Sequence, residues 1–73
     1  MDSTFELLEQ LIKEYSEVSL TRESTLKDLK IDSVDLVEIL LRIEEELGIR
    51  FEDDELFGLK SVQDVLNLVK TKL

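Results

Sequence analysis

The residues of this chain that could take part in chemistry are few, and Ser33, which directly follows Asp32, stands out among them. The chain has no His and no Cys, so it lacks the usual proton shuttle, the thiol nucleophile and nearly all structural zinc chemistry. No nucleophile stands in a pattern with a general base, which makes an enzyme the least favoured class of function. An Asp-Ser pair by itself mostly marks the start of a helix.

The length of the chain limits what it can do. Seventy-three residues make one domain with a small core, because a chain of this size buries little more than about 60% of its unfolded surface. A core and a deep, water-excluding active site would not both fit. Without cysteine the core depends on packing alone, which suits a reducing compartment. We therefore predict a single domain, residues 1–73, that works as a monomer.

The sequence carries no signal for export or for membrane insertion. Its N-terminus lacks the basic segment and the apolar stretch of a signal peptide. The longest apolar run, Ile39-Leu40-Leu41, is far too short to cross a membrane. We expect a protein of the cytoplasm.

The negative charge is concentrated in one third of the chain. The net charge is −9, and residues 32–55 hold ten carboxylates against two arginines, a net −8. Such a field repels nucleic acid and anionic membranes and attracts basic protein surfaces or divalent cations. An acidic face that only keeps a small protein in solution is the alternative interpretation.

Apolar residues recur at helical spacing almost throughout, which predicts an all-α fold without strands. A first helix should begin near Ser3, where Ser3 and Glu6 match a capping box, and continue to about Ser16.

A long loop and a second helix should follow. Residues 17–31 are mostly polar, and we expect Leu26 and Leu29 to fasten this loop to the core. Asp32 suits the N-cap of a helix that runs to residue 47 and ends at Gly48, since glycine favours the left-handed position after a helix.

The remaining sequence predicts one short helix and one longer one. Residues 53–57 allow one or two turns, closed by Gly58, and Ser61 with Asp64 forms a capping box for the last helix. The predicted buried stripe of this helix is Val62, Val65, Leu66, Val69 and Leu73. The expected fold is a small irregular four-helix bundle of three main helices and one short helix.

The second helix differs from the others because it carries two apolar faces. At about 100° per residue, Leu36, Ile39, Leu40, Ile43 and Leu47 share one face. Val34, Val37 and Leu41 share another, about 130° away. Glu38 and Glu45 border the second face, and Ser33 and Glu44 lie between the two. Either the helix is packed on all sides or the second face is a docking surface rimmed by carboxylates, and we favour docking slightly.

Three motifs together resemble the acyl carrier protein family. Asp32-Ser33-Val34 matches an Asp-Ser-Leu-like tripeptide that opens an acidic helix, Val37-Glu38 matches a pair four residues after the serine, and Glu44-Glu45-Glu46 matches an acidic run near the helix end. The order and lengths of the expected elements agree over essentially the whole chain. Lys30 stands where the family usually has glycine, and Arg42 where it commonly has a small residue.

The resemblance implies a carrier rather than an enzyme. A phosphopantetheinyl transferase with its own Mg²⁺ would attach the 4'-phosphopantetheine of coenzyme A to Ser33. The thiol of this arm would then hold acyl groups as thioesters and present them to enzymes of fatty-acid, polyketide or related biosynthesis. Asp32 would cap the helix and help present Ser33.

The resemblance also implies how these enzymes bind. Carboxylates of the acidic helix would contact basic partner surfaces, and the second apolar face would supply short-range contacts. The implied partner-binding residues are Val34, Asp35, Val37, Glu38, Leu41, Glu44 and Glu45.

Two other functions without a prosthetic group remain open. An EF-hand-like calcium site would start at Asp53 and end at Asp64, but it would place Phe57 at a ligand position and the short Asp64 where a bidentate glutamate belongs. A plain acidic adaptor would have the same fold as a carrier, and only the chemistry of Ser33 separates the two.

Overall fold

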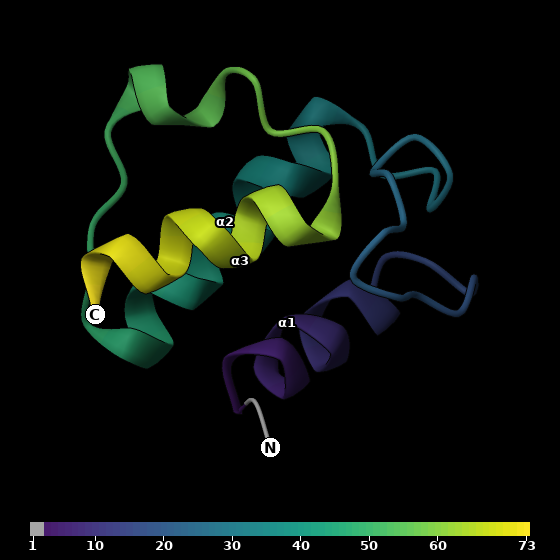
Figure 1. Ribbon diagram of the computed structural model, residues 1–73, viewed down its shortest axis with the longest axis horizontal. Helices are drawn as coiled ribbons and strands as arrows, with labels where there is room; N and C mark the ends of the chain where they lie inside the picture. The colour runs from purple at the N-terminus through teal and green to yellow at the C-terminus, as the bar shows by residue number, and fades with distance from the viewer. Residues whose placement is uncertain (1–2) are drawn as a thin grey trace.

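The computed structural model describes residues 3–73, and over this range its regular elements are all helical (Figure 1). The α-helices are α1 (Ser3–Lys13), α2 (Ser33–Leu47) and α3 (Val62–Lys72). The connector between α2 and α3 contains a short 3₁₀ helix, η1 (Asp53–Leu56). α1 packs against both α2 and α3. The predicted fold of three main helices and one short helix is confirmed.

The core is built from aliphatic side chains, and within residues 3–73 no polar or charged residue is buried. The loop between α1 and α2 contributes as many buried side chains as any helix. The buried positions are Leu8, Leu11, Ile12, Leu20, Leu26, Leu29, Ile31, Ile39, Leu40, Ile43, Val62, Val65, Leu66 and Val69. Each such side chain stabilises the fold by roughly 1.5–3 kcal/mol, so the loop is as much a part of the core as the helices. Its predicted anchors, Leu26 and Leu29, are both buried.

The same loop completes the start of α3. The first backbone N–H groups of a helix have no partner inside it, and here the N–H of Val62 donates to the carbonyl of Ser24 at 2.9 Å. In the other direction, the N–H of Leu26 donates to the carbonyl of Lys60 at 2.8 Å. Loop and helix start are therefore held together by hydrogen bonds as well as by apolar contacts.

The boundaries of α2 follow the sequence. The Asp32 carboxylate accepts the N–H of Asp35 at 2.9 Å, which makes Asp32 the N-cap. Gly48 ends the helix with φ 67°, and its N–H donates to the carbonyl of Glu44 at 2.8 Å. Both local predictions are confirmed.

The capping box of α3 is also formed. The hydroxyl of Ser61 accepts the N–H of Asp64 at 3.2 Å, and the Asp64 carboxylate accepts the N–H of Ser61 at 3.1 Å. The carboxylate also accepts the N–H of Lys60 at 3.0 Å. These backbone donors, that of Lys60 first, lower the pKa of Asp64 below its usual value.

Three helix ends differ from the sequence prediction. α1 ends at Lys13 rather than near Ser16, because the chain tightens there and the N–H of Tyr15 reaches the carbonyl of Ile12 three residues back. Ser3 is itself helical, whereas the predicted capping box needs Ser3 to precede the helix. Leu73 is 67% exposed rather than buried, because α3 ends at Lys72 and the last residue leaves the helical stripe.

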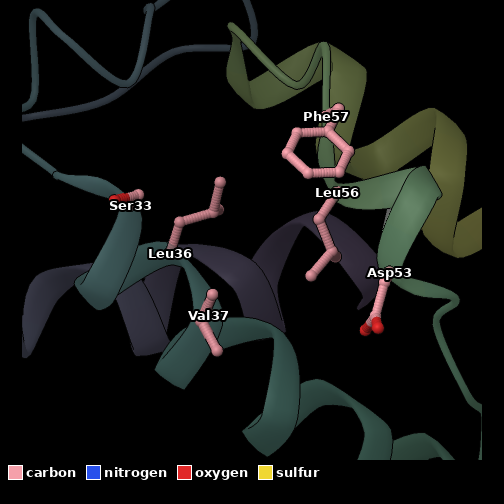
Figure 2. A pocket seen from close by; sticks show the side chains of 6 residues that line it. All are labelled: Ser33, Leu36, Val37, Asp53, Leu56 and Phe57. Atoms are coloured by element: carbon pink, nitrogen blue, oxygen red, sulfur yellow. The ribbon is translucent and has the colours of Figure 1, made fainter.

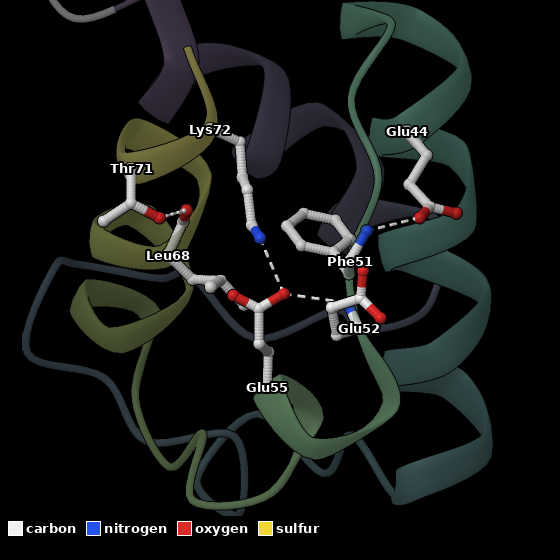
Figure 3. Close-up of polar contacts among 7 residues, drawn as sticks. All are labelled: Glu44, Phe51, Glu52, Glu55, Leu68, Thr71 and Lys72. Atoms are coloured by element: carbon white, nitrogen blue, oxygen red, sulfur yellow. Dashed lines mark hydrogen bonds and ion pairs between the residues drawn. The ribbon is translucent and has the colours of Figure 1, made fainter.

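Two polar contacts hold the connector that carries η1 (Figure 3). The carboxylate of Glu44 accepts the N–H of Phe51 at 2.6 Å, which ties the connector to α2. On the other side, Glu55 forms an ion pair with Lys72 of α3 at 2.7 Å and accepts the N–H of Glu52 at 2.8 Å. The Lys72 ammonium, followed by this backbone donor, lowers the pKa of Glu55.

Lys30 adopts a left-handed backbone conformation, with φ 59°. It ends a single turn in the loop, where the N–H of Ile31 donates to the carbonyl of Leu26 at 2.9 Å. α2 ends in the same way at Gly48, since the N–H of Ile49 donates to the carbonyl of Glu44 at 3.2 Å. Glycine is the usual residue in this position because a Cβ atom disfavours it.

This pair of positions gives a test of backbone strain. Lys30→Gly should stabilise the fold by about 0.5–1 kcal/mol, because the relief of strain exceeds the added freedom of the unfolded chain. Gly48→Ala is the matched control and should destabilise it by about 1 kcal/mol, since a Cβ there meets no neighbour within 4 Å and acts through the backbone alone. Thermal melts of both variants measure the effect. Equal destabilisation by the two changes would contradict the strain at Lys30.

Candidate functional site

Ser33 is the first residue of α2, and its side chain is exposed to solvent. The capping role that an Asp-Ser pair commonly has is performed by Asp32. The Ser33 hydroxyl is therefore not needed to begin the helix. It lies at the positive end of the helix dipole, where a phosphate ester is favourably placed.

An apolar strip, formed by Val34, Val37 and Leu41, follows Ser33 along the outer side of α2. These side chains are 65%, 40% and 52% exposed, whereas Ile39, Leu40 and Ile43 on the opposite side are buried. The two faces expected from the helical spacing therefore have different surroundings. The alternative in which α2 is packed on all sides is excluded for this structure.

A groove leads from Ser33 along the gap between α2 and η1 (Figure 2). It is an open depression of about 400 Å³. Leu36 points into it from α2 and Leu56 from η1, with the ring of Phe57 at its edge. The residues that line this Ser33 groove are Ser33, Leu36, Val37, Asp53, Leu56 and Phe57.

Carboxylates surround the apolar strip as expected. Glu38 is exposed and lines a shallow depression with Ser33 and Val37. Glu45, also exposed, lies beside Leu41. Asp35 is in the first turn of α2 and is half-buried.

Glu44 differs from the other carboxylates of the predicted rim. It is half-buried, and its bond to the N–H of Phe51 holds the connector in place. Sequence spacing placed Glu44 beside the strip but missed this structural role, because the contact joins residues seven positions apart through the turn after α2.

Arg42 lies away from the apolar strip and points towards the end of α1. It forms an ion pair with Glu14, which follows α1, at 2.8 Å. The hydrogen bond that Arg42 donates to the Glu14 carboxylate, followed by the one to Tyr15, raises the pKa of Arg42 above its usual value. Its charge is thus directed towards α1.

The residues of the calcium alternative are used for other contacts. Glu55 pairs with Lys72, and the Asp64 carboxylate caps α3. Phe57, at a position that would need an oxygen ligand, is exposed. Within residues 3–73, no group of three or more acidic side chains is placed to hold a metal ion. The geometry therefore does not favour a calcium site.

Comparisons with known proteins agree with this geometry. Residues 6–69 match the family described as phosphopantetheine attachment site. An acyl carrier protein of Coprothermobacter proteolyticus is 34% identical over 76 residues, which cover 99% of this chain and 93% of the relative. One from Rickettsia canadensis is 34% identical over 92% of this chain and 78% of the relative. The chain belongs to the acyl carrier protein family.

A solved structure supports the same assignment. The crystal structure of an acyl carrier protein from Thermotoga maritima is 27% identical and superposes with a TM-score of 0.78, covering 94% of this chain and 88% of that one. As a member of the family, the chain is a carrier protein and not an enzyme, and its cofactor is phosphopantetheine. Acyl-handling enzymes and a phosphopantetheinyl transferase are the general partners of this family. No helix among residues 3–73 is long and apolar enough to span a membrane.

The residues around Ser33 fit such an arm. The Ser33 hydroxyl is exposed and would be accessible to a phosphoryl donor, and the first turn of α2 has backbone N–H groups that would favour a phosphodiester. The apolar walls of the Ser33 groove suit the uncharged part of the arm and its cargo. The sequence analysis did not single out the η1 side of this groove. Only the isolated apolar pair Leu56-Phe57 within an acidic segment could have indicated it.

The two faces of α2 should respond differently to truncation. Ile43→Ala should destabilise the protein by roughly 2–5 kcal/mol, because it leaves a cavity in the core. Leu41→Ala should cost less than about 1 kcal/mol, because half of its side chain already faces solvent. Thermal or denaturant unfolding compares the two variants directly. A loss at Leu41 as large as that at Ile43 would show that the apolar strip belongs to the core.

Proposed function

We propose that this chain carries its phosphopantetheine arm on Ser33 and that partner enzymes dock on the apolar strip and the carboxylates beside it. The observation that carries the proposal is the exposed Ser33 hydroxyl at the start of α2, in a helix whose cap is supplied by Asp32. The family assignment supports Ser33 as the attachment residue, because the segment that matches the phosphopantetheine attachment family, residues 6–69, contains Ser33.

The modification is a transfer of one phosphoryl-linked group. The Ser33 oxygen attacks the phosphorus of coenzyme A that bears the pantetheine group and loses its proton. The bond from this phosphorus to the bridging pyrophosphate oxygen breaks, and adenosine 3',5'-bisphosphate leaves. The N-terminus of α2 stabilises the negative phosphodiester that results. The attached arm supplies a thiol, which holds an acyl group as a thioester.

The docking part of the proposal rests on charge and exposure. A basic partner is attracted by the net −8 of residues 32–55 and oriented by Glu38 and Glu45, which border the strip. Val34, Val37 and Leu41 then provide contacts that form at short range. Asp35 and Glu44 belong to the proposed surface as well, and Glu44 serves the connector in addition. We place the protein in the cytoplasm as a monomer.

The proposal predicts modification at a single residue. The unmodified protein, treated with coenzyme A and a broad-specificity phosphopantetheinyl transferase, should gain the mass of one phosphopantetheine, and Ser33→Ala should gain none. Intact-mass spectrometry gives the answer. Ser61→Ala is the control, since Ser61 caps α3 and its loss should leave the mass gain intact.

If the wild-type protein gains no mass under these conditions, the carrier role of Ser33 is wrong. The chain would then act as an acidic adaptor, the alternative with the same fold.

The proposed carboxylate rim predicts a second effect, on association. Glu38→Lys should slow association with the basic transferase roughly three- to tenfold at low salt, because long-range attraction accelerates encounter. The salt dependence of the rate should also become flatter. Stopped-flow kinetics at several salt concentrations measure both. Glu6→Lys makes the same charge change on α1, and an equal effect there would mean that only net charge matters.

A further inference from the structure

Phe57 is the most exposed large apolar side chain among residues 3–73, at 81%. It follows η1 in an extended conformation and precedes Gly58, whose φ is 87°. Its neighbour Leu56 turns inward and packs against the core cluster. Leu56 therefore contributes to the packing of the fold, whereas the ring of Phe57 remains in solvent.

The position of the ring links it to the proposed attachment site. Phe57 lines the same groove as Ser33 and Val37, although it comes from the connector and they come from α2 (Figure 2). A protein that brings its reactive centre to the Ser33 oxygen has to cover the mouth of this groove. The ring at the edge of the groove then lies under that protein.

The charges around the groove indicate the chemistry of the protein that covers it. Asp53 lines the groove at the end away from Phe57 (Figure 2), Asp54 next to it in η1 is exposed, and Glu38 lies on the far side of Val37. An exposed aromatic group on a groove with carboxylates along its rim suits a partner with an apolar centre and a basic rim. The same charges disfavour a second copy of this acidic chain, with its net charge of −9.

We propose that Phe57 is a specificity-determining contact for the phosphopantetheinyl transferase, which makes the docking surface extend from α2 across the Ser33 groove onto η1. This inference rests on the proposed modification of Ser33. The transferase buries the ring against an apolar side chain of its own, while its basic rim meets Asp53 and Glu38. Because Phe57 does not touch the reacting atoms, it contributes to binding and not to the transfer step.

The test compares three variants of the unmodified protein as substrates of the transferase with coenzyme A. Phe57→Ala should raise the KM for the carrier roughly tenfold and leave kcat unchanged. Tenfold corresponds to about 1.4 kcal/mol, which burial of part of an aromatic ring can supply. Phe57→Tyr keeps the ring and should restore the wild-type KM. Leu73→Ala removes a similarly exposed apolar side chain outside the groove and should have no effect.

A binding measurement on a variant that cannot be modified tests the contribution of the Phe57 ring in the absence of the phosphopantetheine arm. In the Ser33→Ala background no arm is attached, so the carrier's own cargo cannot be the occupant of the groove. Calorimetry with the transferase should show the same roughly tenfold weakening when Phe57→Ala is added. The melting temperature of Phe57→Ala should match the wild type, because the fold leaves this ring exposed.

Each outcome distinguishes this inference from the proposed function. Wild-type protein that gains no mass overturns the role of Ser33. Normal modification with an unchanged KM for Phe57→Ala overturns the role of Phe57 alone. A wild-type dimer that becomes monomeric in Phe57→Ala, seen by sedimentation, assigns the ring to a second copy and also overturns the inference.

Discussion

The rotation of α2 about its own axis determines most of what this protein presents to solvent. Ile39, Leu40 and Ile43 are buried in the core, and a helix advances about 100° per residue. Once these three side chains are inside, the direction of every other side chain on α2 is set. Val34, Val37 and Leu41 then point away from these three residues, and all three are exposed. The same small set of apolar contacts thus holds the domain together and orients its proposed docking surface.

Local chemistry made much of the fold predictable from the sequence. Asp32, Gly48 and the Ser61–Asp64 pair act within a few residues of their own positions, so their effects can be worked out without a three-dimensional structure. The second apolar face was equally readable, because helical periodicity alone separates it from the first. Its exposure was not, since spacing cannot say whether a neighbouring element covers a face.

The missed features depend on contacts between distant segments. Glu44 looked like one more surface carboxylate until the turn after α2 brought the N–H of Phe51 to it. The loop before α2 looked like a polar connection with two anchors, yet Leu20 and Ile31 are buried too. The positive φ of Lys30 gives a physical meaning to a residue that stands where the family usually has glycine. Phe57 stood in an acidic segment, and its place beside Ser33 followed only from the path of the connector.

The two walls of the Ser33 groove differ in how firmly they are built. The α2 wall belongs to a capped helix with three buried side chains, so its amides open to solvent only when much of the domain unfolds. The η1 wall has no fully buried residue: it is held by Leu56, which packs partly buried against the core, and by the bonds of Glu44 and Glu55. Short-lived local opening is therefore expected first at the η1 wall. A firm α2 wall and a more mobile η1 wall would let the groove adjust to bound groups of different size without loosening the core.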